Sequence, residues 1–284
     1  MFSPDLSIKA YQNRFLGERR FFVKASLLIL ATGTLVHAQN AEAMNATVVN
    51  RSARMRALSQ RLAKLKTQQF LQVNLDATSD SIVATEKLMN SHLQFLSSSV
   101  PAVSRTKLDN LSQSANALLT QSKASPTAES LKQTNTMSLE LLKAADELTI
   151  EMQSLAKVKA VEVVNLSGRQ RMLSQRMAKN YFLAAAHADN KEAAARISAD
   201  RKLFADSMKV LGDSPFADAK VKQELANLAS RYKKYEDLIG DISDKGVSKA
   251  NMATVATMSE QVLASAHELT TLFEEALKSK EVGA

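Results

Sequence analysis

Two stretches of the chain, far apart in the sequence, carry nearly the same 17 residues. Residues 48–64 read VVNRSARMRALSQRLAK and residues 163–179 read VVNLSGRQRMLSQRMAK, so 12 of the 17 positions are identical at an offset of 115 residues. A second, weaker pair lies downstream, where residues 138–157 and residues 259–278 share seven of 20 positions at an offset of 121. Because both ends of one unit recur, the sequence predicts two structural units of the same kind.

The repeat divides the chain into residues 1–43, a first unit over residues 44–157 and a second unit over residues 158–284. Only seven Gly and four Pro occur in 284 residues, and the few clusters of turn-forming residues cut each unit into four segments. Within these segments apolar residues recur at spacings of three and four, which is typical of amphipathic helices. Two such stripes are Leu108, Leu111, Ala115 and Leu118, and Leu225, Leu228, Tyr232 and Tyr235. We therefore expect an all-α fold of two tandem up-and-down four-helix bundles.

Residues 1–43 have the three-part pattern of a secretory signal. A basic region is followed by the 12-residue apolar run Ala25–Val36 and by small-residue cleavage candidates after Ala38 and after Ala43. The basic region contains Arg19–Lys24, RRFFVK, which resembles a twin-arginine export signal. The apolar run is shorter than the about 20 residues that span a bilayer. We therefore expect export to the periplasm with removal of the signal, by the twin-arginine route or by the general secretory route. A retained membrane anchor is the alternative.

The composition removes several classes of function. The chain has no cysteine, which excludes disulfides, thiolate metal sites and a thiol nucleophile. Its four histidines are isolated, and no paired-histidine, phosphate-loop or dinucleotide-binding motif occurs. We therefore expect no metal, no cofactor and no enzymatic activity. His92 and His267 are expected to be ordinary surface or half-buried residues, and Glu274–Glu275 to be solvated.

The net charge is mildly positive once the signal is removed. The whole chain carries +8, and residues 1–38 contribute five Lys or Arg against two Asp or Glu, which leaves about +5 for the mature protein. A basic protein can bind nucleic acid, but export makes that partner unexpected. An anionic ligand or an anionic surface fits the charge better.

The repeated motif, N-x-S-[AG]-R-x-R-x-L-S-Q-R-x-A-K, predicts a polar stripe on a helix. Asn50, Arg56 and Gln60 fall near one face, with the small residue Ala53 between them. An arginine beside small residues at a helix–helix contact loses water and needs a counter-ion or hydrogen-bond partners. Its planar fork of donors suits a planar oxyanion such as nitrate or a carboxylate. Pairing with Asp or Glu on an adjacent helix, or a purely structural packing role, is the alternative.

The motif resembles the PilJ-type periplasmic domain of type IV pilus chemotaxis transducers and the related sensing domain of nitrate/nitrite sensor kinases. The second copy, GRQRMLSQRMAK over residues 168–179, is the closer match. The resemblance implies that the arginine six residues after the motif asparagine contacts the anion. The candidate ligand-binding residues are then Asn50, Arg54, Arg56 and Gln60 in the first copy, and Asn165, Arg169, Arg171 and Gln175 in the second. Arg54 and Arg169 make these copies more basic than the nitrate sensors.

The junction between the two units lacks helix breakers. No Gly or Pro occurs between Thr127 and Gly168, so we expect one continuous helix to join the bundles end to end. Arg56 and Arg171 would then lie about 40 Å apart, since about 28 helical residues would separate them, and each site would need a homodimer. A tight turn near Lys157–Lys159 is the alternative, and two units in one chain could then mimic the family's dimer.

Two functions remain. The first is a soluble periplasmic sensor or binding protein for a small oxyanion, with nitrate or nitrite as the first choice, that signals by contact with a membrane sensor or another periplasmic protein. The second is a ligand-free helical module that docks on a pilus, chemotaxis or envelope protein.

Overall fold

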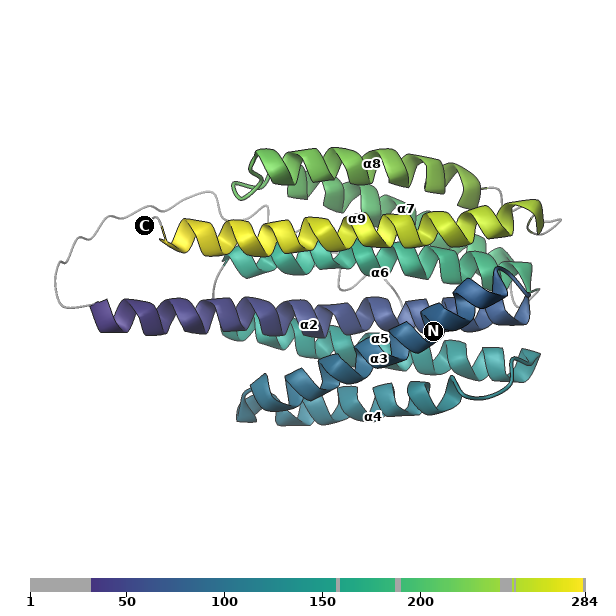
Figure 1. The fold of residues 1–284 in the computed structure, drawn as a ribbon, viewed down its shortest axis with the longest axis horizontal. Coiled ribbons are helices and arrows are strands. Elements are labelled where there is room, and N and C mark those ends of the chain that lie inside the picture. The colour runs from purple at the N-terminus through teal and green to yellow at the C-terminus, as the bar shows by residue number, and fades with distance from the viewer. Residues whose placement is uncertain (1–31, 157–158, 187–189, 241–246, 248, 283–284) are drawn as a thin grey trace. The chain divides into compact units, whose positions relative to one another are not determined.

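The computed structural model describes residues 32–156, 159–186, 190–240, 247 and 249–282. This part of the chain contains eight α-helices, one short 3-10 turn and no strand (Figure 1), so the all-α prediction is confirmed. The helices are α2 (Thr32–Phe70), α3 (Leu75–Ser99), α4 (Arg105–Gln121), α5 (Ala128–Ala156), α6 (Lys159–Ala185), α7 (Asn190–Gly212), α8 (Ala219–Ile239) and α9 (Lys249–Val282). The 3-10 turn covers Ala102–Ser104.

The apolar stripes face the interior as predicted. In α4 the buried residues are Leu108, Leu111, Ala115 and Leu118, and in α8 they include Leu225, Leu228, Tyr232 and Tyr235. Local signals set the helix boundaries. Asp218 caps α8 by accepting a hydrogen bond from the Val221 amide at 2.9 Å. Asn74, at φ 48°, turns the chain between α2 and α3 in the left-handed region that asparagine tolerates.

The helix that was predicted to run through the junction is interrupted. Helix α5 ends at Ala156 and α6 begins at Lys159. The side-chain amide of Asn165 donates to Gln153 Oε1 at 2.5 Å, whereas 12 residues along one helix would separate these two residues by about 18 Å. The chain therefore folds back, and α6 lies beside α5 (Figure 1). The prediction of a continuous helix was wrong because the absence of Gly and Pro does not by itself make a helix continuous.

The repeated segments meet at the centre. Helix α2 contacts α5 through Ser52 and Thr149, whose hydroxyls are 3.1 Å apart, and it contacts α9 through Lys64 Nζ and Ser259 Oγ at 3.0 Å. Helix α6 packs against α9, with α7 and α8 outside this pair, and α4 packs against α5. The two units thus lie side by side inside one compact unit, Ala38–Ala284. The expectation of bundles joined end to end is corrected.

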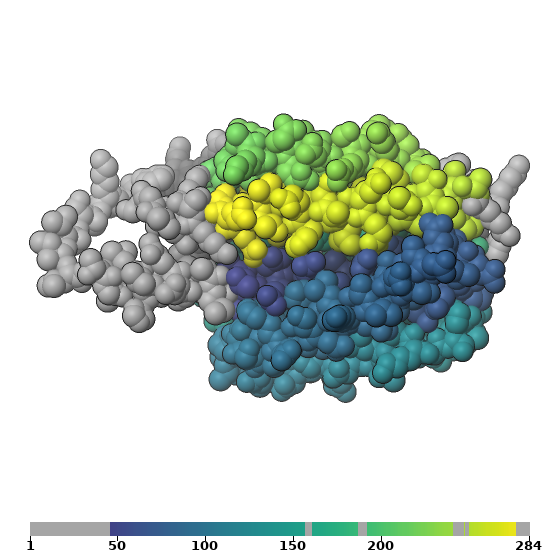
Figure 2. Space-filling model, in the orientation of Figure 1, coloured from purple at the N-terminus to yellow at the C-terminus, as the bar shows by residue number. Residues whose placement is uncertain are grey.

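Helix α2, which carries the first motif copy, is largely covered by its neighbours. In Figure 2 it is visible only as a narrow purple band between α9, in yellow, and α3, in blue. Arg61 on α2 donates to Thr85 on α3 at 2.6 Å and to Glu260 on α9 at 2.7 Å. The face of the molecule between α3 and α9 therefore gives access to one side of the motif helix.

The export signal falls mostly outside the described part. Its twin-arginine stretch, Arg19–Lys24, is not among the described residues, and both cleavage candidates, Ala38 and Ala43, lie within α2. Export stays a prediction. None of the helices in the described ranges combines the length and the apolar character needed to cross a membrane.

Candidate functional site

The two motif copies pair with each other through their asparagines and arginines. Arg56 Nη2 on α2 donates to Asn165 Oδ1 on α6 at 2.6 Å. Arg171 Nη2 on α6 donates to Asn50 Oδ1 on α2 at 2.5 Å. Each copy thus gives an arginine and receives one, as around a two-fold axis. The predicted separation of about 40 Å between the arginines was wrong, so it no longer gives a reason to expect a second chain at each motif.

Small residues allow the two helices to approach. A Cβ atom placed on Gly168 would lie 2.9 Å from Arg171 Nη2 and 3.6 Å from the Cβ of Ala53. The first distance is too short for a real contact, so glycine at this position leaves the space that the Arg171 guanidinium occupies. Ala53 on α2 and Gly168 on α6 thus lie at the helix–helix contact beside the motif arginines.

Because both arginines are buried, their charges need partners that compensate them. Arg56 and Arg171 are each only 1% exposed, and a buried charge without compensation costs several kcal/mol, about 3–5 when its partner is removed. The chain supplies that compensation at Arg56. Its Nη1 donates to Asp146 Oδ1 on α5 at 2.7 Å, and its Nε donates to the Ala53 carbonyl at 3.3 Å. Burial alone would raise the pKa of Asp146, but the charge and the hydrogen bond of Arg56 hold it below its ordinary value.

Arg171 lacks such a carboxylate. Its Nη1 lies 3.4 Å from His267 Nδ1, and its buried Nε has no hydrogen-bond partner among the described residues. Burial, with the charges of Arg54 and Arg56, lowers the pKa of Arg171 to about 9. The guanidinium is therefore still charged at neutral pH. The Glu274 carboxylate raises its pKa in part, but no described Asp or Glu forms an ion pair with it.

His267 takes at Arg171 the place that Asp146 takes at Arg56. Aligning residues 259–278 with residues 138–157 puts His267 on Asp146. Burial and the charges of Arg54 and Arg171 lower the pKa of His267 to about 4, so the ring is neutral at pH 7. Because a guanidinium only donates, Nδ1 accepts in this contact and the ring proton belongs on Nε2.

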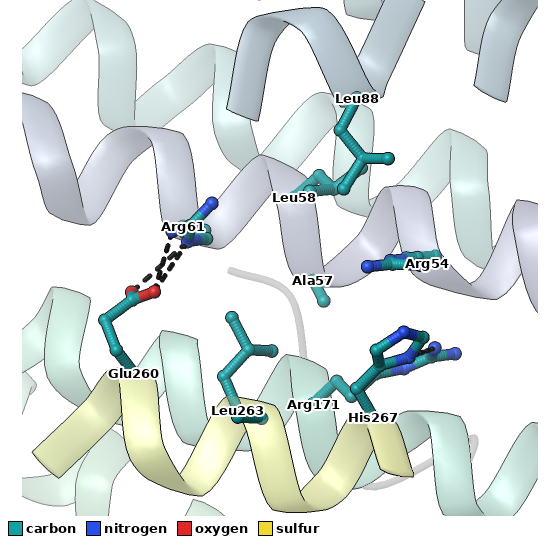
Figure 3. A pocket seen from close by; sticks show the side chains of 10 residues that line it. Arg54, Ala57, Leu58, Arg61, Leu88, Arg171, Glu260, Leu263 and His267 are labelled. Carbon is teal, nitrogen blue, oxygen red and sulfur yellow. Dashed lines mark hydrogen bonds and ion pairs between the residues drawn. The ribbon is translucent and has the colours of Figure 1, made fainter. Parts of the chain in front are cut away.

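A cavity of about 230 Å³ opens beside Arg171 (Figure 3). Helices α2, α3, α6 and α9 contribute its lining. The lining residues are Arg54, Ala57, Leu58, Arg61, Leu88, Arg171, Glu260, Leu263, Ala264 and His267. A second cavity, of about 410 Å³, shares Arg54, Leu88 and His267 with the first and is also lined by Asn50, His92 and Glu274.

The two ends of the first cavity differ in charge (Figure 3). At one end Glu260 accepts hydrogen bonds from Arg61 at 2.7 Å and from Lys64 at 2.5 Å. At the other end Arg54 faces Arg171 and His267, and no described residue forms a hydrogen bond or ion pair with it. Burial, with the charges of Arg51 and Arg61, lowers the pKa of Arg54. This second end is therefore suited to an anion.

His92 adds a further unsatisfied group next to this end. The residue is 4% exposed, and neither ring nitrogen has a hydrogen-bond partner among the described residues. Burial and the nearby Arg54 and Arg51 charges lower the pKa of His92 to about 3, so the ring is neutral and offers one donor and one acceptor.

The remaining predicted residues lie elsewhere. Gln60 and Gln175 donate from their amides to the backbone carbonyls of Ser138 and Ser259, at 3.0 and 2.9 Å, and so fix α2 to α5 and α6 to α9. Arg169 is half-buried and its charge acts on Asp146, and it lines neither cavity. Of the eight predicted residues, the cavities bring together three: Asn50, Arg54 and Arg171.

The acidic and histidine partners of the arginines were not predicted from the sequence. Asp146, Glu260 and His267 were not singled out as site residues, although the second repeated segment places Asp146 and His267 at one position. Glu274, expected to be solvated, is half-buried and lines the second cavity. Within the described ranges, no three His, Asp or Glu side chains come together as metal ligands would.

Residues 157–258 match the PilJ family, described as the N-terminal domain of type IV pili methyl-accepting chemotaxis transducers. The matched segment runs from the junction through α6, α7 and α8 into α9 and contains Arg171 and Gln175. The predicted resemblance to the PilJ family is confirmed for this segment, and the relation to nitrate sensors stays a prediction. The match does not include the first motif copy. No curated protein and no solved structure matches the chain.

Proposed function

We propose that the protein is a periplasmic sensor or binding protein that takes up one small planar oxyanion beside Arg171 and signals by contact with a partner protein. The observation that carries the proposal is the state of Arg171, a buried cation with an unpartnered Nε at the edge of a cavity. Arg56, at the equivalent place, has a carboxylate. An external anion would give Arg171 the counter-charge that the chain gives Arg56.

The chemistry of the cavity favours a planar anion over a spherical one. Guanidinium groups offer parallel N–H donors that match two oxygens of a nitrate or a carboxylate. Arg54 reaches the same end of the cavity from α2, and His267 reaches it from α9. Nitrate and nitrite remain the first inorganic probes, because the resemblance to nitrate sensors names them.

A ligand in this position would connect helices that belong to different units. Arg54 lies on α2 of the first unit, and Arg171 and His267 lie on α6 and α9 of the second. Binding would therefore favour one spacing of α2 relative to α6 and α9, and a small helix shift is the signal we expect a partner to detect. The PilJ-type segment supports a role in signalling, and the export pattern of residues 1–43 supports the periplasm.

One observation favours the second candidate function, a ligand-free interaction module. At Arg56, a complete copy of the motif is satisfied by Asp146, Asn165 and the backbone of Ala53. The motif can therefore serve purely as a packing device. If both copies do so, the protein acts through its surface alone.

Titration calorimetry of the full chain with nitrate, nitrite, sulfate and acetate separates the two functions. The informative variant is Arg54→Met, because Arg54 lines the cavity and forms no hydrogen bond or ion pair with a described residue, so the fold should tolerate it. Arg105→Met, at an exposed arginine on α4, removes the same charge away from the cavity. Saturable binding that Arg54→Met weakens at least tenfold and Arg105→Met leaves intact supports the sensor. No binding of any anion supports the interaction module.

A further inference from the structure

We infer that the ligand is a small monocarboxylate with a short apolar chain, rather than a bare inorganic ion. This inference rests on the proposed function and names the ligand class of the same site. Two observations carry it: the carboxylate that the chain itself places on the equivalent arginine, and the apolar wall of the cavity.

The first observation concerns the anion that already occupies one of the two equivalent positions. Asp146 places a carboxylate oxygen 2.7 Å from Arg56 Nη1. The same position at Arg171 carries His267, whose neutral ring supplies no charge. Each arginine pairs with the asparagine of the other copy. Arg56 Nε also donates to the Ala53 carbonyl, whereas Arg171 Nε has no partner among the described residues. A carboxylate from outside would complete at Arg171 the arrangement that Asp146 completes at Arg56.

The second observation concerns the wall between the two ends of the cavity. Leu58 from α2, Leu88 from α3 and Leu263 from α9 line it, and Ala57 and Ala264 lie among them (Figure 3). A nitrate held by Arg54 and Arg171 would leave these apolar side chains exposed to water. A short alkyl chain attached to the carboxylate would cover them, and burial of apolar surface is favourable.

The volume and the far end of the cavity limit the rest of the ligand. A cavity of about 230 Å³ holds several heavy atoms, since one water occupies about 30 Å³ in the liquid. Glu260 lies at the far end, and the charges of Lys64 and Arg61 overcome the effect of burial and lower its pKa to about 2. Glu260 occupies both cations at this end, through bonds from Arg61 and Lys64, so neither is left without a partner that a second carboxylate on the ligand could supply. The site therefore favours a monocarboxylate over a dicarboxylate.

The test is a series of probes of one chemistry and growing length. Formate, acetate, propionate and butyrate are titrated into the full chain, with nitrate, succinate and the neutral butyramide as comparisons. We expect affinity to rise about fourfold for each added methylene, which corresponds to about 0.8 kcal/mol per group. Butyrate should bind more tightly than nitrate and succinate, and butyramide should not bind.

A variant in the wall separates the apolar contribution from the anionic one. Leu263→Asn should reduce the gain from acetate to butyrate from about 16-fold to below fourfold and leave nitrate binding unchanged. Leu139→Asn, at a leucine that is 38% exposed on α5, is the matched control and should change neither. The inference is overturned if nitrate binds as tightly as butyrate and chain length has no effect, an outcome that leaves the anion site intact. If no probe binds, the proposed function fails together with the inference.

Discussion

Asp146 on α5 and His267 on α9 occupy the same place beside the two buried motif arginines, 121 residues apart in the sequence. Asp146 gives Arg56 a carboxylate at 2.7 Å, and His267 gives Arg171 an imidazole nitrogen at 3.4 Å. The two motif copies thus share their paired arginines and differ in the charge of one partner. The copy with the aspartate is satisfied within the chain, and the copy with the histidine borders a cavity.

Removing the charge of Asp146 should destabilise the fold. In Asp146→Asn the side chain can still accept a hydrogen bond, but the guanidinium of Arg56 loses its counter-ion. Because Asp146 is 36% exposed, water replaces part of the loss, and we expect the free energy of unfolding to fall by about 1–3 kcal/mol. Urea unfolding measures it. Glu147→Gln, which removes an equal charge from an exposed position, should change stability by less than about 0.5 kcal/mol.

The same ion pair predicts a loss of stability in acid. The pKa of Asp146 is lower in the folded protein than in the unfolded chain, so the folded state binds its proton less readily. This contribution is present above the unfolded value, about 4, and disappears as the pH falls through the folded value. Asp146→Asn should flatten that part of the wild-type profile. An unchanged acid profile would show that Asp146 does not compensate Arg56.

The two asparagines of the reciprocal pair should differ in their effect on stability. Asn165 is buried, accepts from Arg56 and donates to Gln153, whereas Asn50 is half-buried and lines the second cavity. Asn165→Ala should therefore cost about 2–3 kcal/mol and Asn50→Ala about 1 kcal/mol, since water can replace the lost partner only at Asn50. If chemical denaturation shows the same loss in the free energy of unfolding for both variants, the predicted effect of burial is wrong.

Gly168 should be required for the position of the Arg171 guanidinium. In Gly168→Ala the new methyl group would lie 2.9 Å from Arg171 Nη2, so the guanidinium must move and its bond to Asn50 is lost. Alanine gains about 1 kcal/mol of helix propensity, and the lost charged hydrogen bond costs about 1.5–3 kcal/mol, so we expect a net loss near 1 kcal/mol. Anion binding should weaken at least tenfold. Gly212→Ala, where no atom lies within 4 Å of the added methyl, should not affect binding.

Lys179 should make the protein more stable in mild alkali. Burial, with the charges of Arg176 and Arg196, lowers its pKa in the folded state to about 7 from 10.5. Between these values the unfolded chain binds the proton and the folded protein does not, so the free energy of unfolding rises with pH by up to about 1.4 kcal/mol per unit. Below pH 7 both states are protonated and the rise is absent.

A substitution identifies Lys179 as the source of that rise. Lys179→Met removes the titrating group and keeps most of the side-chain volume, so it should stabilise the protein at pH 7 and flatten the profile between pH 7 and 10. Lys202→Met, at a lysine that is 76% exposed, should leave the profile unchanged. A wild-type profile that is flat over this range would show that Lys179 keeps its ordinary pKa.

Much of the fold could be read from the sequence because it depends on local pattern. The spacing of Leu108 and Leu111 in α4, and of Leu225 and Leu228 in α8, predicts helices and their buried faces. The small residues Ala53 and Gly168 beside arginines predict a close helix contact. The direction of the chain after Ala156 could not be read, since neither a turn nor a continuous helix needs Gly or Pro there. That one choice decides whether Arg56 and Arg171 lie far apart or meet.

The site was only partly predictable for a related reason. The motif points to Arg56 and Arg171 as special, but it is the same in both copies and cannot say which one is satisfied. That difference comes from Asp146 and His267, on helices that reach the arginines only in the folded protein. The alignment of the second repeated segment shows the change of charge, and only the structure shows what it faces.

The most direct test of the account is anion binding by His267→Asp. This change gives Arg171 the carboxylate that Asp146 gives Arg56, so the chain itself would fill the anion position. We predict that calorimetry detects one anion per wild-type chain and none per variant chain, while the variant unfolds at the same or a higher urea concentration. If the variant binds the anion as the wild type does, the anion does not take the place of a counter-ion at Arg171, and the account is wrong.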